Sequence, residues 1–247
     1  MALTLRVARE SILDSHTLDI MPSAVITGAN SGIGHEFAKV LIDAGYEVHA
    51  VDVNHGEKLK SLGCTTSQLD VASEESIHRF KEQYGDRPLD LLLNVAGVAD
   101  PDHDSLNTLN KDSLSRTFSI NTFGPLLLTQ ALLPNVLRSS QPRLGYVSSR
   151  VGSIGDNGSG GNYAYRSSKT ALNMICKNLA VELKAEGVVV VILHPGIVRT
   201  GIIPGTGDVP GAVDPDEAAS KLYKILVAKG IEDTGKFWHR EGEELPW

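Results

Sequence analysis

The stretch Thr27-Gly28-Ala29-Asn30-Ser31-Gly32-Ile33-Gly34 joins a short apolar run to a segment with the apolar spacing of an amphipathic helix. Gly28 permits a tight exit from a strand, Gly32 lets backbone N–H groups approach a ligand, and Gly34 allows the helix to pack on the sheet. A strand, a glycine turn and a helix in this order form the place where a doubly wound sheet binds a dinucleotide pyrophosphate. The expected cofactor contacts in this turn are Gly28, Asn30, Ser31, Gly32, Ile33 and Gly34.

On both sides of this turn, buried strands alternate with helical segments along the chain. The predicted strands are Ala24–Thr27, Glu47–Val53, Leu89–Asn94, Leu144–Ser148 and Val188–Leu193, with a last short strand at Phe237 and Trp238. The predicted helices are Ile33–Ala44, Ser73–Tyr84, Asn121–Leu137, Tyr163–Ala185 and Pro215–Ala228. Strand and helix in repeated alternation predict a parallel sheet covered on both faces, which is a doubly wound α/β (Rossmann) fold.

The length of the chain suits a single domain of this kind. Residues 21–247 are predicted to form it, because a second methionine, Met21, directly precedes the first strand. Residues 1–20 are predicted to be an N-terminal extension outside the fold.

Composition excludes several classes of function. The net charge of −7 and the lack of a basic cluster argue against nucleic acid as a partner. The longest apolar run, Val188–Leu193, has six residues, far below the roughly 20 that span a bilayer. The two cysteines, Cys64 and Cys176, lack the spacing of a metal site or a disulfide framework. We therefore expect a cytoplasmic protein with no metal and no membrane partner.

One acidic residue bears on the choice of cofactor. Asp52 ends the second strand 24 positions after Gly28, near the distance at which an acid meets the adenosine ribose hydroxyls. Its charge would repel the additional phosphate of NADP. The sequence therefore predicts NAD, with NADP as the alternative because His55 and Lys58 follow closely.

Tyr165 and Lys169 lie four positions apart, so they share one face of a helix. A lysine close to a tyrosine stabilises the phenolate and is expected to lower the pKa of the phenol toward the working pH, where proton transfer is most useful. On its own this spacing is common.

Together with other motifs, this pair makes the chain resemble the short-chain dehydrogenase/reductases, and within them the carbonyl reductases of the C-factor type. The motifs are the glycine turn, Asn94-Val95-Ala96-Gly97, Asn121, Ser148-Ser149 and the run Tyr163 to Asn173, and the resemblance covers about Met21 to Trp247. It implies that Tyr165 is the general acid or base, that Lys169 holds the nicotinamide ribose, that Ser149 polarises the substrate carbonyl and that Asn121 anchors a water for proton relay. It also implies cofactor contacts at Asp70, Val71, Asn94, Ala96, Gly97, Pro195, Gly196, Ile197 and Thr200.

The chain departs from the family pattern in one place. Ser149 stands 16 positions before Tyr165, a few more than is common in the family, and the excess falls in the glycine-rich stretch Gly155–Gly161. Ser148, the other serine of the pair, is predicted to have a structural role. Tyr163 is excluded as the acid because Ser167, not a lysine, follows it by four positions.

These observations predict an oxidoreductase that transfers hydride between a nicotinamide cofactor and a small carbonyl compound or secondary alcohol. The alternatives are a catalytically silent dinucleotide-binding regulator and an enzyme of the same fold that performs elimination or dehalogenation without a cofactor. Residues 197–213 are rich in glycine and proline and are predicted to form a lid. The resemblance implies a homodimer or homotetramer assembled through the two long helices.

Overall fold

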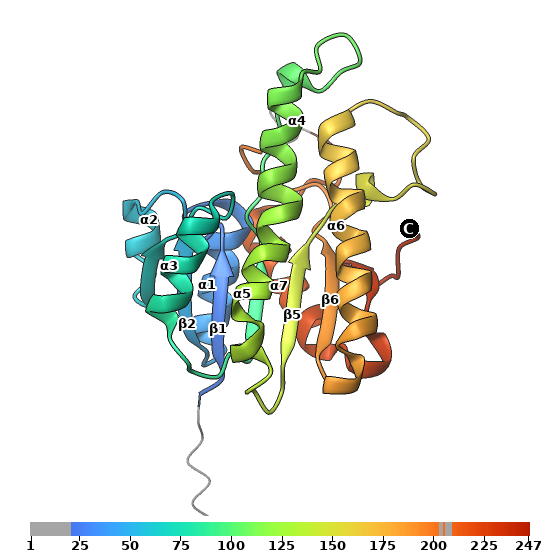
Figure 1. Cartoon of the computed structure of the whole chain (residues 1–247). Coiled ribbons are helices and arrows are strands. Elements are labelled where there is room, and N and C mark those ends of the chain that lie inside the picture. Colours follow the sequence, from blue (N-terminus) through green and yellow to red (C-terminus); the bar gives the residue numbers. More distant parts are fainter. Residues whose placement is uncertain (1–20, 203–204, 206–208) are drawn as a thin grey trace, which may run out of the picture.

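The computed structural model describes residues 21–202, 205 and 209–247. Its centre is a parallel sheet of seven strands in the order β3-β2-β1-β4-β5-β6-β7 (Figure 1). The strands are β1 Ser23–Thr27, β2 Glu47–Asp52, β3 Thr65–Gln68, β4 Leu91–Asn94, β5 Arg143–Val147, β6 Val189–His194 and β7 Lys236–His239. The predicted doubly wound fold is confirmed. The predicted extension, residues 1–20, lies outside the described residues.

Helices cover both faces of the sheet. They are α1 Gly32–Asp43, α2 Glu57–Lys60, α3 Glu74–Tyr84, α4 Lys111–Phe118, α5 Gly124–Val136, α6 Tyr163–Glu182 and α7 Pro215–Ala228. One core joins α3, α5 and α6 to one side of the strands and includes Val25, Leu92 and Val190. The alternate strand positions, such as Ile26, Leu93 and Val191, form a second core with α1 and α7. The alternation follows from the two-residue period of a strand.

Two elements differ from the sequence prediction. β3 was not among the predicted strands because its residues, Thr-Thr-Ser-Gln, are polar; it is an edge strand whose only buried position is Ser67. The helix predicted to begin at Asn121 is preceded by a separate helix, α4, which is capped by the side chain of Asn110. Between α4 and α5 the chain makes a π-helical turn, Ser119–Phe123, that contains Asn121.

The carboxyl ends of the parallel strands meet at one edge of the sheet. The chain reverses direction across the sheet between β1 and β4, and this switch point is where open α/β sheets bind ligands. Helix α4 and the first half of α6 extend beyond this edge and form a wall above it (Figure 1). Among the described residues, no helix is long and apolar enough to cross a membrane.

Candidate active site

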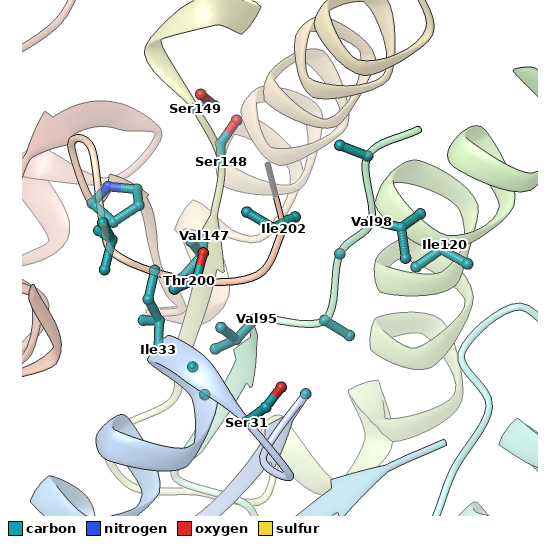
Figure 2. Close-up of a pocket in the computed structure, with 18 of the residues that line it drawn as sticks. Ser31, Ile33, Val95, Val98, Ile120, Val147, Ser148, Ser149, Thr200 and Ile202 are labelled. Carbon is teal, nitrogen blue, oxygen red and sulfur yellow. The ribbon is translucent and has the colours of Figure 1, made fainter. Parts of the chain in front are cut away.

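A cavity of about 1510 Å³ opens at this edge of the sheet. It exceeds the roughly 300–1,000 Å³ of ordinary small-molecule pockets, which leaves room for a dinucleotide and a second molecule. Figure 2 shows Ser31 and Ile33 of the glycine turn at one end of this cavity and Ser148 and Ser149 at the other. The predicted residues that line it are Gly28, Ser31, Gly32, Ile33, Gly34, Asp52, Asp70, Val71, Ala96, Gly97, Ser149, Tyr165, Lys169, Pro195, Gly196, Ile197 and Thr200. Asn30, Asn94 and Asn121 are not among its lining residues.

The glycine turn is packed too closely for larger residues. A Cβ on Gly28, whose φ is 71°, would lie 2.9 Å from the amide nitrogen of Ala96 on the neighbouring strand end. A Cβ on Gly34 would lie only 2.2 Å from the carbonyl oxygen of Gly28. The side chain of Ser31, at the N-cap position of α1, makes no capping hydrogen bond. The turn therefore presents backbone and a helix N-terminus to the cavity, which fits the pyrophosphate of a dinucleotide.

The hydroxyl of Thr27 holds the two strand ends at the floor of the cavity together. Its Oγ1 accepts hydrogen bonds from the amides of Val95 at 3.0 Å and Ala96 at 3.1 Å. Sequence reasoning did not select this residue. Its only signal in the sequence is a threonine at the last position of the first strand, directly before the glycine turn.

Asp52 lies at the end of β2 and lines the cavity. Its Oδ2 accepts a hydrogen bond from the amide of Asn30 at 3.1 Å, and its Oδ1 accepts one from the amide of Asn54 at 2.9 Å. The side chain of Asn30 turns toward α2 instead, where its Oδ1 accepts the amide of Leu59 at 3.0 Å. Asn30 thus fixes the turn to α2, and Asp52 is the acidic group that the cavity presents at this position.

Tyr165 and Lys169 lie on the first turns of α6 and are both buried. The Lys169 Nζ donates to the carbonyl oxygen of Val147 at 3.0 Å and lies 5.9 Å from the centre of the Tyr165 ring. Burial lowers the pKa of Lys169 to about 8. Burial also raises the pKa of Tyr165 to about 12, against a smaller lowering by a hydrogen bond with Ser149.

The expectation that Lys169 brings the pKa of Tyr165 toward neutrality is therefore wrong in this structure. Loss of solvation disfavours the phenolate more than the neighbouring groups favour it. The phenol is held in its protonated form, in which it can donate a proton.

The two serines that follow β5 have different surroundings. The Ser148 hydroxyl is buried and donates to Oδ1 of Asn173 at 2.6 Å. Ser149 is partly exposed in the cavity, and its hydroxyl interacts with Tyr165. Figure 2 shows both side chains at the end of the same strand. Of the two hydroxyls, Ser149 is the one directed to the tyrosine.

The longer segment between Ser149 and Tyr165 does not separate them, because its own contacts fold it back. Arg150 forms an ion pair with Asp156 at 2.7 Å. Arg166, the residue after the tyrosine, donates to the carbonyl oxygen of Val151 at 3.2 Å and to the hydroxyl of Ser159 at 2.8 Å. These contacts take up the additional length in an exposed loop.

Asn121 is completely buried behind the cavity. Its Oδ1 accepts the amide of Val98 at 2.8 Å, and its Nδ2 donates to the carbonyl of Val98 at 2.9 Å and to the hydroxyl of Ser168 at 3.1 Å. It therefore ties the chain after β4 to α6. Asn94 is also buried, and neither its Oδ1 nor its Nδ2 has a protein partner among the described residues.

Arg240 was not selected by sequence reasoning, although it shapes the cavity. Its buried guanidinium donates to the carbonyl oxygens of Pro195 at 2.6 Å, Ile197 at 3.2 Å and Gly211 at 3.1 Å. Several residues of the predicted lid, 203–204 and 206–208, lie outside the described residues. No local motif marks Arg240, because the carbonyl oxygens that it binds at the cavity lie about 30 or more positions away in the chain, although its Nε also pairs with the neighbouring Glu241 at 3.1 Å.

A dinucleotide-sized cavity at the switch point, with a buried tyrosine and lysine and a partly exposed serine at one end, defines a nicotinamide-dependent oxidoreductase of the doubly wound class. The sequence model of the family described as short chain dehydrogenase matches residues 22–207. The chain belongs to this family.

Individual relatives agree with this assignment. The chain is 37% identical over 233 residues to the 1-hydroxy-2-glutathionyl-2-methyl-3-butene dehydrogenase of Rhodococcus sp. (strain AD45), over 92% of this chain and 100% of the relative. It is 38% identical over 160 residues to the C-signal of Myxococcus xanthus, over 65% of this chain and 93% of the relative.

Solved structures of carbonyl reductases have the same fold. The NADPH-bound carbonyl reductase from chicken fatty liver superposes with a TM-score of 0.83 at 29% identity, over 92% of this chain and 99% of that one. The carbonyl reductase Sniffer of D. melanogaster gives a TM-score of 0.84 at 26% identity, over 92% of this chain and 100% of that one. The protein is thus an oxidoreductase that transfers hydride between a nicotinamide cofactor and a carbonyl compound or secondary alcohol. The catalytically silent alternative is not supported.

Proposed function

We propose that the protein is a carbonyl reductase in which Tyr165 is the proton donor. The observation that carries this proposal is the buried phenol of Tyr165, whose pKa is raised by burial to about 12, on the wall of a dinucleotide-sized cavity beside the Ser149 hydroxyl. When bound, a reduced nicotinamide dinucleotide supplies the hydride. Tyr165 would donate its proton to the carbonyl oxygen as the carbonyl carbon takes up the hydride that the cofactor would supply, so that the product is an alcohol.

Each of the other groups has a distinct part in this reaction. Ser149 donates a hydrogen bond to the carbonyl oxygen, where negative charge develops. The Lys169 ammonium stabilises the tyrosinate left behind and binds the ribose next to the nicotinamide. The glycine turn, with Gly28, Gly32 and Gly34, holds the pyrophosphate. Asn121 supports the wall between Val98 and α6 through the hydrogen bonds of its side chain.

Replacement of Tyr165 by Phe tests the proton donor. We expect kcat for carbonyl reduction to fall by about 100-fold or more, because general acid catalysis typically contributes that much. The matched control is Tyr163→Phe, two positions earlier on the same helix and 42% exposed, which should leave kcat unchanged. A Tyr165→Phe enzyme with near wild-type turnover would exclude this mechanism.

For the cofactor we propose NAD rather than NADP. The chicken liver neighbour holds NADPH, which argues for NADP, but this chain presents Asp52 to the cavity. A 2′-phosphate about 4 Å from this carboxylate would be repelled by roughly 4 kcal/mol per unit charge at an effective dielectric of 20. Lys58 also lines the cavity and reduces this repulsion in part.

The ratio of kcat/KM with NADH to that with NADPH measures this choice. We expect a ratio well above one, and a narrowed or reversed ratio in Asp52→Ala. Lys58→Ala should widen the ratio, since it removes the nearby cation. Equal or better efficiency with NADPH in the unmodified protein would contradict the proposal.

The substrate is proposed to be a small carbonyl compound, because the solved neighbours are carbonyl reductases. The relative from Rhodococcus is named for a glutathionyl alcohol, which makes glutathione-bearing alcohols and aldehydes a second class to test. A panel of aldehydes, ketones, quinones and glutathione conjugates, assayed in both directions, separates these classes by kcat/KM.

We also propose that the active form is a homodimer or homotetramer. Met174 and Val181 are 62% and 67% exposed and lie seven positions apart on one face of α6, on either side of the exposed Lys177 and Asn178. These two apolar side chains are the surface through which we expect α6 to contact a second copy. Sedimentation at micromolar concentration should give a species of at least twice 26.5 kDa. A chain that begins at Met21 should retain activity and assembly if residues 1–20 are an extension outside the domain.

A further inference from the structure

The chain enters α6 in a conformation that leaves the first turn of the helix without a local cap. Gly160, Gly161 and Asn162 have φ values of 63°, 70° and 48° in succession. Asn162 occupies the N-cap position, where a side chain usually accepts an amide of the first turn, but it makes no such hydrogen bond. The first amides of α6, including that of Tyr165, therefore need a partner from elsewhere in the fold.

Asp104 supplies this partner from the loop between β4 and α4. Its carbonyl oxygen accepts the amide of Tyr163 at 3.3 Å. Its carboxylate accepts the amide of Ala164 through Oδ1 and the amide of Tyr165 through Oδ2, the latter at 3.1 Å. The side chain is 4% exposed. One residue thus binds three successive amides of α6 from about 60 positions earlier in the chain.

We infer that Asp104 is a positioning residue that fixes the first turn of α6 and thereby the phenol of Tyr165. The inference rests on the proposed role of Tyr165. Asp104 binds the amide of the tyrosine itself, so a loss of this contact frees the backbone that carries the phenol. The same loop includes Val98, which Asn121 ties to α6, so the loop is attached to the helix at two places.

The charge of Asp104 also lies at the start of α6, the helix that carries the tyrosine. Among the ion pairs of the described residues, none includes Asp104, so its negative charge offsets the positive end of the α6 dipole. By this argument we expect loss of the Asp104 charge to favour the phenolate form of Tyr165. The other charged groups on this part of the cavity are Lys169 on α6, Arg116 on α4, Arg166 and the Arg150–Asp156 ion pair, and a substitution at Asp104 leaves all of them in place.

The test compares Asp104→Asn with Asp104→Glu and with a control in the same loop. Asp104→Asn keeps the shape but removes the charge and one acceptor. Asp104→Glu keeps the charge and changes the reach. The control is Asn110→Ala, which removes a cap of the same kind from α4, where the side chain accepts the amide of Ser113 at 2.9 Å.

Three measurements follow for each variant. In Asp104→Asn we expect kcat to fall about 10-fold with little change in KM for the cofactor, because the reacting group and not the binding site is disturbed. The pH profile of alcohol oxidation, which requires the phenolate, should move to lower pH by about 0.5 to 1 unit. Hydrogen exchange of the Ala164 and Tyr165 amides should become faster. Asp104→Glu should lower kcat without moving the profile, and Asn110→Ala should move neither.

An Asp104→Asn protein with an unmoved pH profile and unchanged exchange at the Tyr165 amide would overturn the inference. If kcat falls by the same factor at every pH and the free energy of unfolding falls with it, Asp104 has only a structural role. An active Tyr165→Phe enzyme would instead remove the proposed function, and the exchange measurement would still report whether Asp104 caps α6.

Discussion

The adjacent pair Ser148 and Ser149 allows catalysis and stability to be separated by two single substitutions. Ser149→Ala removes the hydroxyl that lies beside Tyr165 in the cavity. A hydrogen-bond donor to a developing oxyanion is worth about 100- to 1,000-fold in kcat, or about 2.7–4 kcal/mol. Because Ser149 is partly exposed, its removal should change the free energy of unfolding by no more than about 0.5 kcal/mol.

Ser148→Ala should have the opposite effect. It leaves Oδ1 of Asn173 buried without its donor, and the Nδ2 of that residue already has no partner among the described residues. An unsatisfied buried acceptor costs about 1–3 kcal/mol. The free energy of unfolding should fall by this amount, while kcat stays within about threefold of wild type, which corresponds to less than about 1 kcal/mol.

The assay is a two-by-two comparison. Steady-state kcat with saturating cofactor is measured for carbonyl reduction, and urea unfolding gives the change in stability at constant m-value. If Ser148→Ala loses most of the turnover and Ser149→Ala retains it, the assignment of the two hydroxyls is reversed. If neither substitution lowers kcat by tenfold, no serine at this strand end polarises the carbonyl.

Two further predictions concern the glycine turn and the buried amine. Gly34→Ala places a Cβ 2.2 Å from the Gly28 oxygen, so the turn must move; calorimetry should show at least about tenfold weaker dinucleotide binding. The control Gly158→Ala, with no atom within 4 Å, should bind normally. Lys169→Met should end activity yet stabilise the fold below pH 8, because the pKa of this amine falls from 10.5 unfolded to about 8 when buried. At pH 7, chemical unfolding should show a free energy of unfolding up to about 3 kcal/mol higher than that of the wild type, less the contribution of the lost hydrogen bond to Val147. This difference should disappear as the pH rises to 10.5.

Much of the sheet could be predicted because its central strands are short apolar runs, which are typical of buried strands in a parallel sheet. Leu91–Leu93 and Val189–Leu193 are buried on both faces, so they show no polar positions that would confuse the pattern. β3 could not be found in this way, since Thr65–Gln68 forms a polar edge whose place is set by pairing with β2. The boundary between α4 and α5 was also missed, because a π-helical turn disturbs the regular spacing without a proline or glycine break before Gly124.

The site was predictable where function depends on spacing along the chain. The glycine turn and the pair Tyr165 and Lys169 are local patterns, and the structure brings them to one cavity. The pKa of Tyr165 was not predictable, since burial decides it and the sequence does not state how deeply a side chain lies. The contacts that Asp104 makes with α6 and that Arg240 makes with Pro195 join residues far apart in the chain, so no local sequence motif predicts them.

The two ends of the segment from Ile197 to Val213 are joined to each other. Val198 and Val213 form a bridge, and the amide of Arg199 donates to the carbonyl of Val213 at 2.9 Å. Arg240 binds carbonyl oxygens from both ends of the segment. Since the ends are fastened to each other, insertions between them stretch no strand, and the entropic cost of a longer loop grows only slowly. Changes of length or sequence in this segment, in evolution or by design, can therefore alter substrate specificity beside the reacting groups while the rest of the domain keeps its structure.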